Sequence, residues 1–353
     1  MSAIRCCVLG ASGFIGGQIV RAALAEGLQV RAVRRRPNAA GAIEDLNVEW
    51  VIGDLSDPAS LVTAMRGCPL VFHAAGYYPR HARDIHETMA HGVSGMRNAI
   101  SAAATAGVKR LIYTSALTTI GPPSDPNQLA AETDMYTPGT VPNPYFEVKW
   151  AMEMEAMRAT AQGFPVIIVL PTATFGPGDV KPTTSTLLLR VAQGGVPGYV
   201  DGILNVADGR DVAVGHIAAA RRGQPGKRYI LGGHNLPIKE VLAIAARAAG
   251  RKPPRVKFSP GMVRLVAKLG SRLRRIPGIY HLLAIDSYQA INDAQSRKEL
   301  ELSAPIPFEQ TCFDTLLWFH ERGLLKRRPV PVVQAAAEAG EPQPVQGSAA
   351  PNA

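Results

Sequence analysis

Short apolar runs alternate with longer stretches of helical periodicity in the first half of the chain. We expect a helix over residues 16–26, because Ile15, Ile19 and Ala23 fall near one face and Gly27 then supplies a stop. The apolar runs predict strands at residues 4–9, 28–33, 48–52, 70–73, 110–114 and 166–170. Strands that alternate with helices indicate a doubly wound parallel sheet, so the predicted fold class is α/β, of the Rossmann type.

The pattern weakens after about residue 171, where glycine and proline become more frequent. We expect a Rossmann domain over 1–175 and a smaller C-terminal substrate-binding subdomain over 176–327, interleaved with the first. Its predicted helices lie near residues 238–249, 263–273 and 309–322. Residues 328–353 are rich in Pro, Ala, Gln and Glu and contain few large apolar side chains, which predicts a disordered tail.

Composition supports a globular protein with a sizeable core. Of 353 residues, 46% are hydrophobic and 19% are charged. The four cysteines show no metal-ligand spacing, and we expect them to be reduced and structural. No apolar run approaches the roughly 18 residues that a membrane span needs, and the N-terminus does not resemble a signal peptide. A cytoplasmic location is therefore expected, and no metal site is predicted.

Basic residues are concentrated in two places, at Arg34-Arg35-Arg36 and between Arg264 and Arg275, and the formal net charge is +10. In the second stretch, basic residues alternate with Leu and Val, which predicts an amphipathic helix. Two interpretations stay open for it, a solvated basic face and a peripheral contact with an anionic membrane. Nothing resembles a nucleic-acid-binding module, and aromatic residues are only 6% of the chain. A homodimer is left open.

A glycine-rich turn between the first strand and the first helix predicts a dinucleotide site. Gly10 allows a tight turn, Gly13 allows close approach to a pyrophosphate, and Gly16 lets the helix pack on the sheet. The helix N-terminus then offers unpaired N–H groups to the phosphates. The residues expected to contact the cofactor here are Gly10, Ser12, Gly13, Phe14, Ile15 and Gly16.

Three arginines follow the second strand, at a point where an acidic residue would favour NAD. Arginine can bind a 2′-phosphate in a bidentate manner, so we expect NADP as the cofactor, with NAD as the alternative. Arg34 and Arg35 are the predicted ligands of this phosphate.

Further motifs follow in a fixed order. Gly53-Asp54-Leu55 comes after the third strand and His73-Ala74-Ala75 after the fourth, followed by Tyr145-x-x-x-Lys149 and then Leu170–Pro177. With the glycine turn, these motifs resemble the extended short-chain dehydrogenase/reductases over roughly residues 3–325. Within that superfamily the chain is most similar to the dihydroflavonol 4-reductase-like and NAD-dependent epimerase/dehydratase branch, including bacterial hopanoid-associated members.

The resemblance implies roles for residues in these motifs. Asp54 and Leu55 would contact the adenine, and Ala74 and Ala75 would line the cofactor groove. Asn98 would help to order the active site.

The last motif and one departure complete the resemblance. Pro171 and its neighbours, Thr174 among them, would face the nicotinamide. The chain has Gly92 where the family often has Asn before Val-x-Gly.

Tyr145 and Lys149 are the predicted catalytic pair. They lie at i and i+4 and so project from one face of a helix, whose start Pro142 and Pro144 mark. An ammonium near a phenol favours the phenolate, so the tyrosine can serve as a general acid or base. The lysine can also hold the ribose of the cofactor.

The third catalytic residue is ambiguous. The family places a Ser or Thr after the fifth strand, but counting back from Gly121 puts Ala116 at that position. Either Ser115 takes the role by a small shift, or Thr118 reaches in, or the site works with Tyr145 alone. We name Ser115 as the expected residue.

These features predict an NAD(P)-dependent oxidoreductase that transfers hydride between the nicotinamide and a ketone or secondary alcohol. The substrate is expected to be a small molecule of isoprenoid, steroid-like or flavonoid-like type. A nucleotide-sugar epimerase or dehydratase with tightly bound NAD is the first alternative, and Lys181 and Arg190 would then bind a diphosphate. A non-catalytic cofactor-sensing protein is the second alternative.

Overall fold

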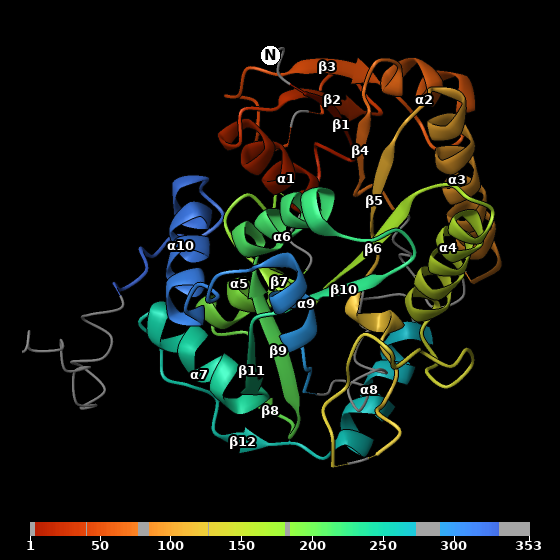
Figure 1. Ribbon diagram of the computed structural model, residues 1–353. Coiled ribbons are helices and arrows are strands. Elements are labelled where there is room, and N and C mark those ends of the chain that lie inside the picture. The colour runs from red at the N-terminus through yellow and green to blue at the C-terminus, as the bar shows by residue number, and fades with distance from the viewer. Residues whose placement is uncertain are drawn as a thin grey trace, which may run out of the picture.

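The computed structural model describes residues 4–39, 41–76, 85–125, 127–180, 184–272 and 290–331. A seven-stranded, all-parallel sheet runs through the centre of the molecule in the order β10-β6-β5-β4-β1-β2-β3 (Figure 1). Its strands are β1 (Arg5–Leu9), β2 (Gln29–Arg34), β3 (Glu49–Ile52), β4 (Leu70–His73), β5 (Arg110–Thr114), β6 (Val166–Pro171) and β10 (Arg228–Leu231). The predicted doubly wound α/β fold is confirmed.

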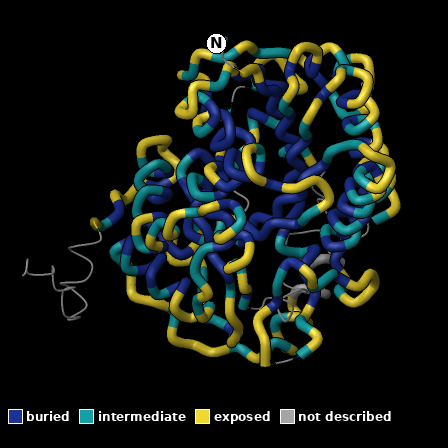
Figure 2. The backbone as a smooth tube through the Cα atoms, in the orientation of Figure 1, coloured by how far each residue is buried: buried dark blue, intermediate teal, exposed yellow. Residues whose placement is uncertain are grey.

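Helices cover both faces of this sheet, because successive strand residues point to opposite sides and both sides are apolar. One face packs against α1 (Phe14–Ala25) and α6 (Gly209–Arg222). The other packs against α2 (Pro58–Met65), α3 (Ile85–Thr105) and α4 (Pro144–Ala161). Figure 2 shows the buried residues gathered on the sheet and on the inward sides of these helices.

Helix starts follow local capping chemistry. The Asp57 carboxylate accepts hydrogen bonds from the N–H groups of Ala59 and Ser60, and Pro58 occupies the first helical position of α2. Asn143 caps α4 in the same way, through a 3.0 Å bond from the Tyr145 N–H, with Pro144 next to it. The cap fixes the start of α4 directly before Tyr145.

The carboxyl half of the chain forms a second layer of structure, which has its own core. A three-stranded sheet, in the order β11-β9-β7, packs with α5, α7 and α10 around Phe175, Leu188 and Phe308. Its elements are β7 (Ala173–Phe175), α5 (Thr186–Ala192), β9 (Ile203–Asp208), β11 (His234–Pro237), α7 (Ile238–Ala248) and α10 (Phe308–Glu321). The remaining elements are η1 (Leu117–Thr119), β8 (Gly198–Tyr199), β12 (Val256–Lys257), α8 (Pro260–Arg272) and α9 (Ala294–Leu300).

The six predicted strands match β1 to β6 to within one residue at each end. The sequence pattern did not reveal β10 or α6, although β10 completes the main sheet beside β6. The main sheet thus takes a strand from beyond residue 175, where the predicted Rossmann domain ends. Glycines and prolines around these elements interrupt the alternation that marked the earlier strands.

Packing continues to Val330, beyond the predicted boundary at residue 327. Pro329 is buried, and the Val330 N–H donates to the Ala248 carbonyl at the end of α7. Both residues belong to the predicted tail, of which 332–353 lie outside the described residues. Among the described residues, no helix is long and apolar enough to cross a membrane.

Candidate active site

The glycine turn is packed so tightly that larger residues are excluded. Gly10 has a φ of +82°, and a Cβ there would lie 2.8 Å from the Ala75 nitrogen. A Cβ on Gly16 would lie 2.1 Å from the Gly10 carbonyl oxygen, so that position cannot accept alanine without a shift of the backbone. Gly13 is exposed, although a Cβ there would still lie 3.2 Å from the Gly10 carbonyl oxygen. The turn therefore presents bare backbone to a ligand.

The N-terminus of α1 has the properties that a pyrophosphate needs. No side chain caps this helix, and its first turn contains no acidic residue. The N–H groups of Phe14 and Ile15 open the helix, while the Phe14 ring packs against Gly176 and Gly209. The predicted residues thus fit a dinucleotide phosphate through their backbone, and Phe14 itself is part of the packing.

Arg34 and Arg35 lie in different environments at the end of β2. The Arg34 guanidinium stacks over the Trp50 ring, 4.6 Å from its centroid, and its buried Nε has no hydrogen-bond partner among the described residues. Arg35 is exposed, and its charge helps to lower the pKa of Asp54. The larger cause of that lowered pKa is the pair of hydrogen bonds from the Ser56 N–H and hydroxyl.

The loop after β3 is held in place by a hydrogen bond from α3. The Asn98 amide donates to the Leu55 carbonyl at 2.7 Å, so Asn98 orders the loop that holds the predicted adenine contacts. Ala74 and Ala75 follow β4, and the Ala74 N–H donates to the Leu9 carbonyl at 3.0 Å. This bond holds the end of β4 against the glycine turn. The two segments together form one wall of the predicted cofactor groove.

Tyr145 and Lys149 project from the first two turns of α4. Tyr145 is half-buried, whereas Lys149 is buried at 8% exposure. The Lys149 ammonium donates to the Thr114 carbonyl at 3.0 Å, at the end of β5. A Cβ on Gly76, beyond Ala75, would lie 3.9 Å from Nζ. Lys149 therefore points to the edge of the sheet where the glycine turn also lies.

Burial lowers the pKa of Lys149 to about 8, and the nearby Glu153 carboxylate opposes that shift. His73, at the end of β4, is completely buried, and neither ring nitrogen has a hydrogen-bond partner among the described residues. Burial lowers its pKa to about 3, and the charge of Lys149 adds to the effect. His73 is therefore neutral at physiological pH, and Lys149 is the ionisable group beside it whose charge depends on pH near neutrality.

Ser115 is committed to a buried partner. Its hydroxyl donates a short hydrogen bond to Glu153, which is fully buried one turn after Lys149 in α4. The other Glu153 oxygen is paired with Arg228 Nε of β10 at 2.7 Å. Arg228 also donates to the carbonyls of Thr119, at 2.7 Å, and Glu132, at 2.5 Å.

Thr118 has a different environment. Its hydroxyl oxygen is buried without a hydrogen-bond partner among the described residues, and it belongs to η1, which packs against α4. Ala116, at the position where the family has a hydroxyl, is 8% exposed. Thr118 thus has an uncommitted oxygen next to the helix of Tyr145, whereas Ser115 does not.

Comparisons with known proteins agree with this geometry. Residues 6–232 match the NAD dependent epimerase/dehydratase family, which is more than half of the chain. This chain belongs to that family. A "Putative dihydroflavonol 4-reductase" of Synechocystis sp. is 33% identical over 90% of this chain and 95% of its own length. "Sterol demethylase protein B" of Methylococcus capsulatus is 30% identical over 90% and 99%.

A solved structure, described as that of gox2253, superimposes with a TM-score of 0.80 at 33% identity, and it covers 92% of this chain and 100% of its own. The predicted family resemblance, the fold class and the assignment to nicotinamide-dependent oxidoreductases are thereby confirmed. The family is NAD dependent, and the bare backbone of the glycine turn fits such a dinucleotide.

The other site residues predicted from the sequence, where they are described, lie on β6, on β7 and in α5. The Thr174 hydroxyl donates to the Thr172 carbonyl at 2.9 Å, and Pro171 ends β6 beside Leu231. Lys181 lies outside the described residues, and Arg190 is exposed in the last turn of α5. Among the described residues, no group of three His, Cys, Asp or Glu could hold a metal ion.

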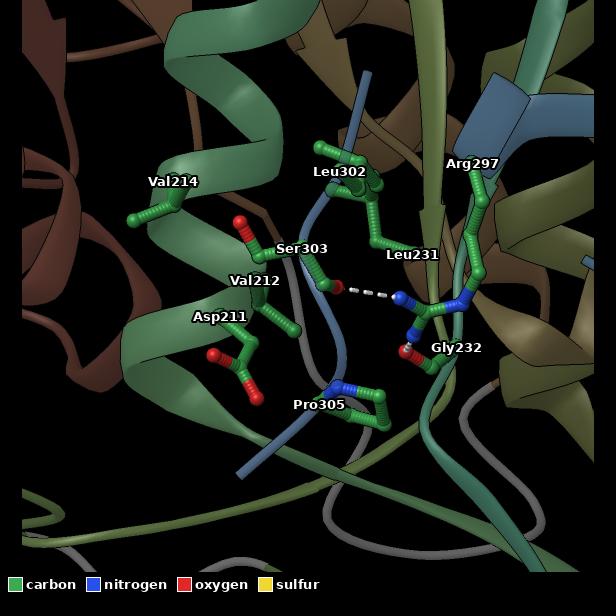
Figure 3. A pocket seen from close by; sticks show the side chains of 9 residues that line it. All are labelled: Asp211, Val212, Val214, Leu231, Gly232, Arg297, Leu302, Ser303 and Pro305. Carbon is green, nitrogen blue, oxygen red and sulfur yellow. Dashed lines mark hydrogen bonds between the residues drawn. The ribbon is translucent and has the colours of Figure 1, made fainter. Parts of the chain in front are cut away.

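One small cavity, of about 40 Å³, lies between α6, β10 and the segment after α9 (Figure 3). Arg297 closes one side, with bonds to the carbonyls of Ser303, at 2.7 Å, and Gly232, at 3.0 Å. Opposite, the Asp211 carboxylate accepts from the Ile306 N–H at 2.7 Å. The cavity has room for about one water molecule, so it is a small packing gap between these elements and not a substrate site.

Sequence reasoning missed Glu153 and Arg228, and it used His73 only as part of a motif. Glu153 could have been found, since it continues the spacing of Tyr145 and Lys149 by four more residues. Arg228 could not, because its position depends on β10, which the pattern did not reveal.

Proposed function

We propose that this chain is an NADP-preferring oxidoreductase that interconverts a ketone and a secondary alcohol. The observation that carries this proposal is the placement of the Lys149 ammonium. It is buried beside the predicted cofactor groove, held by the Thr114 carbonyl, and one helical turn from Tyr145. A bound nicotinamide would supply or accept the hydride.

Tyr145 moves the proton in this proposal. Its phenol donates to the substrate oxygen in the direction of reduction and accepts from it in the direction of oxidation. Lys149 has three N–H donors, of which one goes to Thr114. The others serve the ribose and the phenol, so one ammonium both orients the cofactor and favours the phenolate.

We propose Thr118 as the hydroxyl that hydrogen-bonds the substrate oxygen, in place of Ser115. Ser115 donates to Glu153, whereas the buried Thr118 oxygen has no partner among the described residues. Thr118→Val should lower turnover by about two orders of magnitude, the usual effect of losing a donor to a developing oxyanion. Ser115→Ala should lower turnover less but lower the melting temperature more. The reverse pattern would return the role to Ser115.

The substrate class rests on the relatives. One is named for a sterol and another for a dihydroflavonol, and both names refer to polycyclic compounds. We propose a polycyclic or isoprenoid ketone, or the corresponding alcohol. A screen of such compounds for NADPH oxidation, or for NADP reduction, tests this directly, and turnover of nucleotide sugars alone would favour an epimerase.

The preference for NADP is tested by dissociation constants for NADPH and NADH. Arg34→Ala and Arg35→Ala should each weaken NADPH about 10- to 100-fold, as expected for lost charge-assisted bonds, and leave NADH nearly unchanged. Arg36→Ala is the matched control, because it removes the same charge from the same turn. Equal affinities of the parent protein for both cofactors would refute the preference, and NAD that co-purifies would favour the epimerase.

A further inference from the structure

The net positive charge of this protein equals the charge of one stretch of the chain. Residues 241–285 contain ten basic and no acidic side chains, which equals the whole formal excess of +10. The remaining 308 residues contain 28 basic and 28 acidic side chains. None of the residues assigned to the cofactor or to catalysis lies in the stretch, so the reaction gives no reason for its charge.

The same stretch exposes an aliphatic stripe. Met262, Leu265, Val266 and Leu269 follow one another at intervals of three, one and three along α8, and they are 45%, 59%, 55% and 51% exposed. This spacing places them on one side of the helix. In the described part of the chain, 12 large hydrophobic residues are exposed, and five of them lie between residues 256 and 269. No described helix or strand packs extensively against α8.

Basic residues accompany the stripe. Arg264 is exposed, and Lys268 and Arg272 follow it in the same helix at four-residue intervals. Arg255 and Lys257, before and in β12, are also exposed. Figure 1 shows β12 and α8 at one end of the molecule, away from β3 and α2 at the other. The combination on α8 is that of a helix that lies in a membrane interface.

We propose that α8 docks this protein on an anionic lipid bilayer. The stripe enters the boundary between headgroups and acyl chains, and the basic residues lie against the lipid phosphates. Nucleic acid needs no aliphatic stripe and would leave these side chains in water. A second copy of the chain would bring two stretches of the same charge together in a twofold contact, and their repulsion opposes it.

The test is co-sedimentation of the full chain with vesicles of phosphatidylcholine alone or with a third of phosphatidylglycerol. Binding should require phosphatidylglycerol and fall as salt is raised. Arg264→Gln/Lys268→Gln/Arg272→Gln should weaken binding about 100-fold, since each basic residue near an anionic surface contributes about fivefold. Leu265→Ser/Val266→Ser should weaken it by at least about tenfold.

Two control variants separate this surface from general effects. Arg66→Gln/Lys109→Gln/Lys298→Gln removes the same charge from other exposed positions, and Val214→Ser alters a side chain on α6 that is as exposed as Val266, at 55%. Both should bind vesicles like the parent. Circular dichroism melting checks that every variant is folded.

The proposal is overturned if phosphatidylcholine binds equally well, or if the α8 variants bind like the parent. It is also overturned if sedimentation without lipid shows a dimer that Leu265→Ser/Val266→Ser dissociates, or if duplex DNA binds and competes with the vesicles. Vesicle binding needs no turnover, so its failure would leave the proposed reaction standing, and the converse also holds.

Discussion

Two groups of charged residues in this protein differ in burial, since one is enclosed by the protein and the other is exposed. Under the candidate active site, Lys149, Glu153 and Arg228 are each less than one-tenth exposed, and each has a specific partner. At the end of the molecule that carries α8, Arg255, Lys257 and Arg264 are exposed, and the same segment carries exposed aliphatic side chains.

The difference separates two uses of charge. A buried charge is costly to desolvate, so it persists only with a partner at a defined distance, and its position is then fixed. An exposed charge is screened, costs little and acts through the number of like charges around it. The buried group can therefore orient the proposed catalytic pair, whereas the exposed group is suited to the proposed attraction to an anionic surface. Removing single charges should show this difference most clearly.

The largest expected effect is on the buried ion pair. Glu153→Ala leaves the Arg228 guanidinium without its carboxylate and the Ser115 hydroxyl without its acceptor. We expect a loss of about 3–5 kcal/mol in the free energy of unfolding, as for other buried pairs that lose one partner. Urea unfolding measures it.

A double variant is the control for this prediction. Glu153→Met/Arg228→Met removes both charges, so it should cost clearly less than the sum of the two single variants. Additive losses would mean that there is no coupling energy between the two side chains. They would contradict the claim that each buried charge depends on its partner.

A smaller effect is expected from the pH dependence of Lys149. Its pKa in the folded protein is about 8, against 10.5 for the ordinary side chain. Above pH 8 the folded state loses this proton while the unfolded state keeps it, so stability rises with pH. Relative to Lys149→Met, the parent should gain about 2 kcal/mol between pH 7.5 and 9.5. Parallel stability curves for the two proteins would contradict the lowered pKa.

The smallest effect on stability is expected at α8. Arg264→Gln and Leu265→Ser alter exposed side chains, so each should change the free energy of unfolding by less than about 0.5 kcal/mol. Vesicle binding should nevertheless change strongly in the same proteins. A stability loss of 2 kcal/mol or more, measured by urea unfolding, would show that α8 is packed against the rest of the protein. The difference between this surface and the buried ion pair would then disappear.

The sequence revealed the cofactor half of the fold because local rules govern it. Alternating apolar strands, the Gly10–Gly16 turn and the Asp57 cap are each encoded within a few residues. It could not show which strand lies beside β6, since β10 follows a stretch in which glycines and prolines interrupt the pattern. Long-range pairing of that kind has no local signal.

The sequence likewise revealed one part of the candidate site and not the other. The i, i+4 spacing of Tyr145 and Lys149 was visible, and so was the absence of a hydroxyl at Ala116. The choice between Ser115 and Thr118 was not, because it depends on Glu153 of α4 reaching Ser115 after β5 and on Arg228 holding Glu153 in place. Three elements far apart in sequence meet there.

Tyr145→Phe tests the central claim most directly, because it removes one hydroxyl and keeps the ring. On a ketone identified by NADPH turnover, kcat should fall by at least about 100-fold, the scale of general acid–base catalysis, while the Kd for NADPH stays within about twofold. Lys149→Met, in contrast, should lower kcat and also weaken NADPH binding. Near-parent turnover by Tyr145→Phe would contradict the account, because the proton would then have to move through a different group.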